Sequence, residues 1–283
     1  MACSGTTEIG GCEMIRHVKA VLKEVLPPRV SFYLKLFRYW RDSAAVIGFL
    51  LCREFSLPLR QRLRMVKQLY VIHLSVESPH QQGEILEFIK AMLSMTGDPN
   101  AVFVEAGCYK GSSTAKFSLA ADIAGRTLVV FDSFDGIPYN SEPHSKDIFG
   151  NHVSFGGGNY RASLEEVQCN VTRYGSIKSC RFVKGWLEDT LPSFKEEVAA
   201  VYLDVDLASS SRTCLRYLYP LLQPGGVLFS QDGHLPLVID VFEEESLWDE
   251  EIGCKPPLVD GLGSKKLLKI VKGVTRQGRN PLS

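Results

Sequence analysis

Two carboxylates end an apolar run in the stretch VYLDVDLASSS, at Asp204 and Asp206. A second polar pair, Gln231 and Asp232, ends the next apolar run, in VLFSQDG. Such runs are typical of buried parallel strands, whose carboxyl ends meet at one edge of a sheet. Oxygen ligands without sulfur suit a hard cation such as Mg²⁺. We therefore expect Asp204 and Asp232 to bind a divalent cation, which would lower the pKa of a substrate hydroxyl.

Asp206 and the general base have more than one interpretation. Asp206 precedes ASSSRT, so it either caps the helix that begins there or is only a neighbour of the cation site. No lysine follows Asp204 closely, which leaves three candidates for the base: Asp204 itself, His144 and His234. A lone histidine is more often structural than catalytic, so the base stays open.

A glycine-containing turn, VEAGCYKGSS, follows an earlier apolar run. Glu105 ends that run, and Gly107 and Gly111 permit a tight turn into a helix whose backbone N–H groups can face a ligand. The spacing E-x-G-x-x-x-G differs from G-x-G-x-x-G, the pattern with which dinucleotide-binding chains hold a pyrophosphate. An acidic residue beside the glycines would repel a pyrophosphate and suits the cationic methionine part of S-adenosylmethionine. A plain strand–turn–helix junction is the alternative.

Two further positions fit a nucleotide-like cofactor. Asp132 ends the second apolar run, about twenty residues after the glycines, where an acid holds ribose hydroxyls in doubly wound folds. A capping or solvated aspartate is the alternative there. Trp186 follows Gly185 at the end of the third run, where an adenine would bind. Its ring either flanks that base or packs in the core.

Strands and helices alternate from residue 76 onwards, which predicts an α/β fold. We expect a Rossmann-like doubly wound sheet, mostly parallel, with a C-terminal antiparallel hairpin around GLGS. By analogy, such a hairpin favours the S-adenosylmethionine-dependent methyltransferase type over NAD-dependent dehydrogenases. The methyltransferase domain would span residues 76–283. Residues 1–75 would form an N-terminal helical extension or lid.

Basic and aromatic residues are interleaved between residues 16 and 41, where acids are few. A membrane-surface or partner-binding helix has this composition, and so has a helical extension with a solvated basic face, which we favour. These helices could also join a homo-oligomer.

The composition excludes other classes of protein. The chain has 283 residues, of which 45% are hydrophobic, and 32 basic residues balance 32 acidic ones. A globally basic nucleic-acid binder is therefore not expected. No apolar run is long enough to span a bilayer, and the cysteines form no CxxC pair. We expect a cytoplasmic protein with reduced thiols and no integral membrane segment, acting on a small molecule.

Six blocks of the sequence together resemble the macrocin O-methyltransferase family. They are, in order, FVEAGCYKGSS, FDSFDGIP, SLEEVQCNVTRYG, FVKGWLEDTLP, YLDVDLASSSRTCLRYLYPLLQPGG and QDG. Members of this family are S-adenosylmethionine-dependent, Mg²⁺-assisted enzymes, best known for methylating sugar hydroxyls of natural products. The resemblance implies that this chain methylates such a hydroxyl. It also implies that the helices before the core help to cover the active site, and that the segment with His144, His152 and FGGGNY is a mobile substrate loop.

The resemblance also assigns site residues by position. Glu105, Gly107 and Gly111 would line the methionine part of the cofactor, and Tyr109 and Ser112 of the same turn would also bind the cofactor. The ribose would contact Asp132 and Ser133, and the adenine would contact Gly185 and Trp186. The cation would lie between Asp204, Gln231 and Asp232. This chain departs from the family at Gln231, where a second acid is usual, and so carries one negative charge less.

Three other functions stay open. SPHQQGEIL is similar to the helix before the cofactor strand in caffeoyl-CoA-type enzymes, which favours a catechol or phenol O-methyltransferase. The neutral side chain of Gln231 would suit a catalytically inactive methyltransferase-like scaffold. An NAD-dependent dehydrogenase is disfavoured because G-x-G-x-x-G is missing.

Overall fold

The computed structural model describes residues 42–275, and the chain divides into two compact units, residues 1–44 and 45–283. The basic and aromatic segment of residues 16–41 lies outside the described residues, and so do the roles predicted for it. Among the described residues, no helix combines the length and the apolar character needed to cross a bilayer.

The second unit begins earlier than the domain boundary predicted at residue 75. It includes the helix α4 (Leu59–Ser75), which buries Met65, Leu69 and Ile72 in the same core as the sheet. This shared core explains why the unit boundary precedes α4. A lid role for the residues up to 75 stays a prediction.

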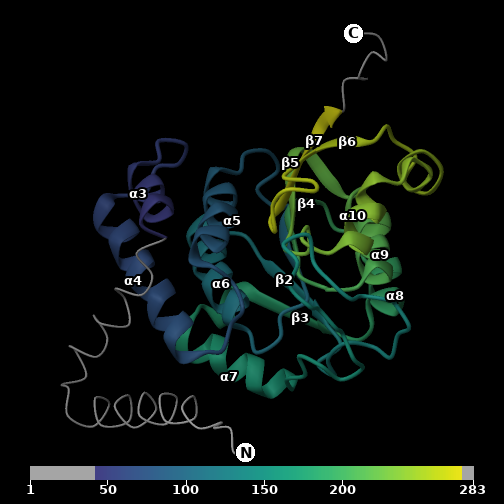
Figure 1. Cartoon of the computed structure of the whole chain (residues 1–283). Helices are drawn as coiled ribbons and strands as arrows, with labels where there is room; N and C mark the ends of the chain where they lie inside the picture. Colours follow the sequence, from purple (N-terminus) through teal and green to yellow (C-terminus); the bar gives the residue numbers. More distant parts are fainter. Residues whose placement is uncertain (1–41, 276–283) are drawn as a thin grey trace, which may run out of the picture. The chain divides into compact units, whose positions relative to one another are not determined.

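A seven-stranded sheet in the order β3-β2-β1-β4-β5-β7-β6 forms the centre of this unit (Figure 1). The strands are β1 (Val102–Ala106), β2 (Leu128–Asp132), β3 (Cys180–Lys184), β4 (Val198–Leu203), β5 (Leu222–Ser230), β6 (Pro257–Asp260) and β7 (Leu268–Thr275). Strands β1 to β5 are parallel, and β7 runs antiparallel to both β5 and β6. The predicted doubly wound sheet with its C-terminal hairpin is confirmed.

Helices cover both faces of the sheet (Figure 1). The further helices are α3 (Ser43–Leu51), α5 (Gln82–Ser94), α6 (Ser112–Ala124), α7 (Leu164–Tyr174), α8 (Leu187–Thr190), α9 (Ala208–Leu218) and α10 (Pro236–Glu243). Three short helical turns complete the order, namely Ile177–Ser179, Leu191–Ser193 and the π-helical turn Leu247–Ile252.

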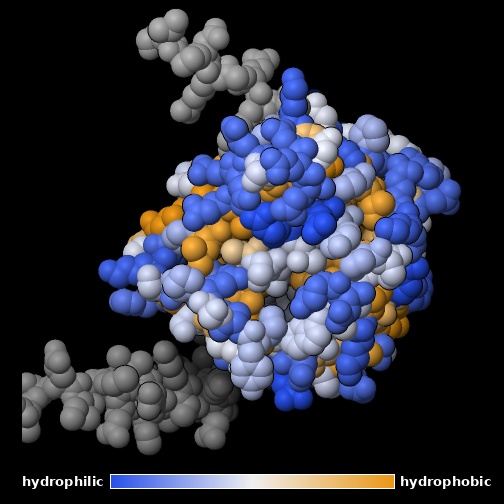
Figure 2. Space-filling view, turned by 90° about the vertical axis from the view of Figure 1, so that its right-hand side faces the viewer, coloured by the Kyte–Doolittle hydropathy of each residue, from blue (hydrophilic) through white to orange (hydrophobic). Residues whose placement is uncertain are grey.

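Successive side chains of β4 point to opposite faces of the sheet, so the strand contributes to the hydrophobic core on each face. Tyr202 packs with Phe88 of α5 and Phe117 of α6, at ring-centroid distances of 5.1 and 4.8 Å. Leu203, the next residue, belongs to the opposite core with Leu215 of α9. The outer surface on the α9 and α10 side is largely hydrophilic, as expected for amphipathic helices (Figure 2). The sheet is therefore held between two apolar layers, and its carboxyl edge lies between them.

Candidate active site

A cavity of about 330 Å³ opens at the carboxyl ends of the parallel strands. Nine of the predicted site residues line it: Gly107, Tyr109, Asp132, Ser133, Gly185, Trp186, Asp204, Asp232 and His234. The long segment after β2 contributes another wall, with Ile137, Pro138, Val153, Phe155 and Tyr160 among its residues. The cavity lies where ligands bind in doubly wound sheets, because the strand ends leave a crevice there.

Gly107 allows the ends of β1 and β4 to approach each other closely. Its φ of +81° is a left-handed conformation, and a Cβ atom on it would lie 2.0 Å from the backbone oxygen of Asp204. No other residue fits this position without moving the strand end. The glycine predicted to permit a tight turn thus also shapes the cavity wall beside Asp204.

Asp132 organises two loops at the cavity. Its Oδ2 accepts a hydrogen bond from the backbone N–H of Cys108 at 2.7 Å, and its Oδ1 accepts one from Phe134 at 2.7 Å. The carboxylate thereby ties the glycine turn after β1 to the turn after β2. Trp186 is half-buried and lines the cavity, so its indole is not a core side chain.

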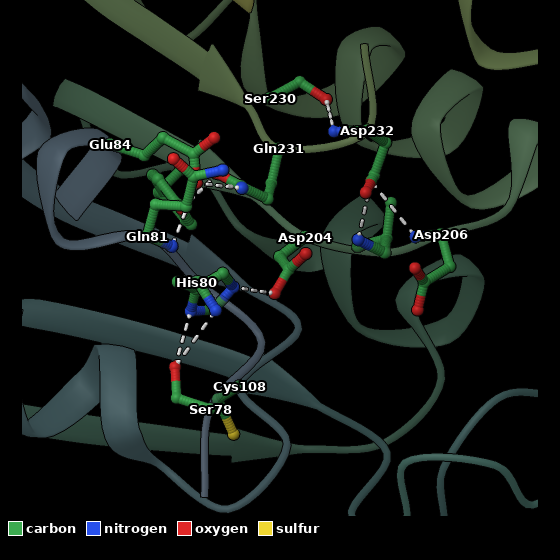
Figure 3. A network of polar contacts seen from close by, with 12 residues as sticks. Ser78, His80, Gln81, Glu84, Cys108, Asp204, Asp206, Ser230, Gln231 and Asp232 are labelled. Carbon is green, nitrogen blue, oxygen red and sulfur yellow. Dashed lines mark hydrogen bonds and ion pairs between the residues drawn. The ribbon is translucent and has the colours of Figure 1, made fainter. Parts of the chain in front are cut away.

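Three acids meet at one side of the cavity. Asp204, Asp206 and Asp232 each offer a carboxylate oxygen within 4.8 Å of the others (Figure 3). Backbone N–H groups of Val205 and Asp206 donate to Oδ2 of Asp232 at 3.0 and 3.1 Å. Asp206 joins this group with a left-handed φ of +60°, which is uncommon for a residue other than glycine. The donor set consists of hard oxygens only, which fits Mg²⁺ or Mn²⁺.

The three carboxyl groups differ in their electrostatics. Burial, and then the charge of Asp204, raises the pKa of Asp232 to about 7. Burial, Asp232 and Asp204 raise the pKa of Asp206 well above its usual value. Burial would also raise the pKa of Asp204, but the neighbouring His80 imidazole holds it below its usual value. Like charges at this spacing repel, and a bound cation would relieve that repulsion.

Gln231 does not join the acid cluster. Its Oε1 accepts a hydrogen bond from the Tyr202 hydroxyl at 2.7 Å, and its Nε2 donates to Glu84 at 2.7 Å (Figure 3). The carboxamide is fully buried and is not part of the cavity wall. The structure therefore replaces Gln231 with Asp206 in the candidate ligand set.

Asp206 does not cap α9, the alternative that the sequence left open. The helix N-terminus instead binds Glu142, whose carboxylate accepts from the backbone N–H groups of Ala208 and Ser209 at 2.8 and 2.9 Å. The Ser209 hydroxyl donates to the same carboxylate at 2.6 Å. Glu142 belongs to the segment after β2, so this contact fastens that cavity wall to α9.

The two histidines predicted as general bases lie in different places. The imidazole of His144 lies 3.0 Å from Glu142, is almost fully buried and does not line the cavity, so it supports the helix cap instead of a reaction. His234 lines the cavity, and burial followed by Lys266 lowers the pKa of its imidazole. Lys266, from the connection between β6 and β7, lines the cavity as well.

The remaining predicted contacts lie behind the cavity. Glu105 is fully buried, and burial raises the pKa of its carboxyl to about 8. Gly111 precedes α6 and faces Val167, and Ser112 is buried in the first turn. The structure does not bring these three residues to the cavity, because the turn carries Gly107 and Tyr109 to it instead.

His80 and Lys266 were missed by sequence reasoning. His80 contacts Asp204, 124 positions later, and no local spacing indicates such a contact. The similarity of SPHQQGEIL to caffeoyl-CoA-type enzymes was the signal that could have drawn attention to His80. For Lys266 the predicted hairpin was correct, but its proximity to the strand ends was not apparent.

We expect Glu142→Ala to lower the free energy of unfolding by about 1 to 2 kcal/mol, because the α9 N-terminus loses its acceptor for two backbone N–H groups. Chemical denaturation measures this change. Glu245→Ala, which removes an exposed glutamate after α10, is the control and should leave stability within about 0.5 kcal/mol. Equal stability of both variants would contradict the capping role.

The fold belongs to the class of S-adenosylmethionine-dependent methyltransferases. The chain is similar to the crystal structure of a calicheamicin methyltransferase, with a TM-score of 0.51 and 15% identity over 96% of this chain and all of that one. The model of the macrocin O-methyltransferase family matches residues 90–244, more than half of the chain. The chain therefore belongs to this family, which confirms the resemblance seen in the sequence.

Two curated relatives each match about half of the chain. A mycinamicin III 3''-O-methyltransferase from Micromonospora griseorubida is 32% identical over 50% of this chain and 58% of its own length. An 8-demethyl-8-(2,3-dimethoxy-alpha-L-rhamnosyl)-tetracenomycin-C 4'-O-methyltransferase from Streptomyces olivaceus is 31% identical over 56% of this chain and 63% of its own length. The chain thus spans about three fifths of the length of these relatives.

Proposed function

We propose that the chain transfers a methyl group from S-adenosylmethionine to a hydroxyl of a small molecule, namely a sugar hydroxyl of a glycosylated natural product, with the help of a divalent cation. The single observation that carries this proposal is the cluster of Asp204, Asp206 and Asp232 beside a cavity built on the glycine turn. Family membership and relatives named for O-methylation support it.

The residues present fit the cofactor. Gly107 lines the cavity at the end of β1, and Asp132 and Trp186 line it at the ends of the next two strands in the sheet. Gly107 and Tyr109 would contact the methionine part, Asp132 and Ser133 the ribose, and Gly185 and Trp186 the adenine. This order follows the strand ends from β1 through β2 to β3.

The acids fit the cation. Asp204, Asp206 and Asp232 would hold it, and when bound it would supply Lewis acidity that lowers the pKa of the acceptor hydroxyl. The walls of the cavity would orient the acceptor oxygen toward the methyl carbon. Of the two predicted histidine bases, His234 lines the cavity, and it would receive the hydroxyl proton.

Titration calorimetry with S-adenosylhomocysteine tests the cofactor part of the proposal. We expect saturable binding to the wild-type protein, and methyl transfer to a member of a panel of glycosides and phenols that depends on added Mg²⁺ and stops with a chelator. A folded protein that binds neither S-adenosylmethionine nor S-adenosylhomocysteine would contradict the proposal. Cofactor binding without turnover of any acceptor would favour the scaffold alternative.

The cytoplasmic location and an assembly through the N-terminal helices stay predictions. A soluble fraction assay of the native host and light scattering of the full chain test them.

A further inference from the structure

His80 lies against the acid cluster without belonging to it. Its Nε2 is 2.7 Å from Oδ2 of Asp204, and its Nδ1 is 3.2 Å from the Ser78 hydroxyl (Figure 3). The residue is only 6% exposed, and its ring meets the ring of Tyr202 edge-on at 6.2 Å. Both nitrogens therefore have partners, and packing fixes the plane of the imidazole.

The contact with His80 uses one oxygen of the Asp204 carboxylate, and the other oxygen does not contact His80. Figure 3 shows the second carboxylate oxygen directed away from His80, on the side where Asp232 and Asp206 lie. A carboxylate with one oxygen tied to a fixed imidazole cannot rotate freely about its terminal bond. The free oxygen is then held facing the other two acids.

The backbone that carries His80 is itself tied to the sheet. Gln81 and Glu84 form a capping box at the start of α5, in which the Glu84 carboxylate accepts from the Gln81 backbone N–H at 3.2 Å. Glu84 also accepts from Gln231, whose oxygen accepts from Tyr202. The segment is thus anchored to β4 through Tyr202 and to the end of β5 through Gln231.

These contacts give the unusual Gln231 a role. The carboxamide donates to Glu84 and accepts from Tyr202 at the same time, which an ionised carboxylate cannot do. A carboxylate at this position would face the Glu84 carboxylate without a proton between them. Gln231 therefore helps to anchor the segment that carries His80, and Asp206 takes its predicted place among the candidate cation ligands.

We propose that His80 is a positioning residue, which orients the Asp204 carboxylate for a divalent cation and is held in place by the Ser78 hydroxyl and the Glu84–Gln231 contact. This inference rests on the proposed function. It concerns a residue that lies outside the ligand set, on the segment before α5 and not on a strand end.

Cation affinity tests the proposal separately from turnover. We expect His80→Ala to weaken Mn²⁺ binding 10- to 100-fold, measured by calorimetry and by the electron paramagnetic resonance signal of free Mn²⁺. The affinity for S-adenosylhomocysteine should stay within about 2-fold, because His80 does not line the cavity. His80→Gln places an amide nitrogen near the lost Nε2 and should recover part of the Mn²⁺ affinity.

Gln68→Ala is the matched control. It removes another hydrogen bond from the helices before the sheet, the 2.8 Å contact of Gln68 with the Tyr174 carbonyl, which lies outside the cavity wall. We expect its Mn²⁺ affinity to equal that of the wild type. Thermal unfolding shows whether each variant is folded. If His80→Ala is not folded, the Mn²⁺ affinity of His80→Gln is compared with that of the wild type instead.

Two outcomes would overturn the inference. One is a folded His80→Ala protein that binds Mn²⁺ as tightly as the wild type. The other is a wild-type protein that binds S-adenosylhomocysteine but no Mn²⁺, since Asp204 would then have no cation to face. Failure of the proposed function is a different result, namely the absence of any cofactor binding.

Discussion

Asp204→Asn should lower kcat/KM for methyl transfer at least about 100-fold, since losing an outer-shell partner of a metal ligand already costs 10- to 100-fold and a ligand should cost no less. The carboxylate offers an oxygen to the shared acid cluster and receives His80 on its other side. The variant should also bind Mn²⁺ more weakly and keep its affinity for S-adenosylhomocysteine. Initial rates at varied acceptor and Mg²⁺ concentrations measure the effect.

The same variant should remain folded. Asparagine keeps an oxygen that can accept from His80, and it removes the charge that helps to raise the pKa of Asp232 and Asp206, so we expect at most a small loss of thermal stability. Asp240→Asn, on the exposed surface of α10, is the matched control and should keep wild-type rates. Full Mg²⁺-dependent activity of Asp204→Asn would show that the strand-end acids do not bind the cation.

Gln231→Glu should lower the free energy of unfolding by about 2 to 4 kcal/mol, although the change is isosteric and restores an acid that the family usually has. The new carboxylate would be buried against Glu84 and could not donate to it. We also expect no gain in Mn²⁺ affinity, because the side chain at this position points away from the acid cluster (Figure 3). Chemical denaturation and calorimetry measure the two quantities.

A second substitution tests the cause of that loss. Adding Glu84→Gln to Gln231→Glu reverses the polarity of the pair, so that an amide again donates to a carboxylate and the Tyr202 hydroxyl keeps an acceptor. We expect the double variant to recover at least half of the lost stability, which a double-mutant cycle quantifies. If Gln231→Glu instead tightened Mn²⁺ binding without loss of stability, residue 231 would be a cation ligand after all.

The class of fold could be predicted because its signals are local. Apolar runs in VFVEA, LVVFD and VAAVYL have the length and composition of buried strands, and amphipathic or glycine-started helices follow them. Gly107 marks the first turn for the same reason, since its left-handed φ requires a residue without a side chain. The order of these elements then placed the cofactor positions at one edge of a parallel sheet.

The candidate site could be predicted only in part. Asp204 and Asp232 meet because parallel strands put their carboxyl ends together, which the alternation of strands and helices already implies. Side-chain direction after a strand ends follows no period. Asp206 joins the cluster through a left-handed φ, while Gln231, beside Asp232, turns into the core toward Tyr202.

The amino-acid sequence by itself determined the α/β class, the glycine turn and the pair of strand-end acids, because each depends on neighbouring residues and on the regular geometry of strands. Only the tertiary structure decided which side chains complete the site. His80 meets Asp204 across 124 positions, and Glu142 caps α9 from a distant segment, which also draws His144 away from the cavity. Such contacts arise from the packing of separate elements, and no spacing along the chain encodes them.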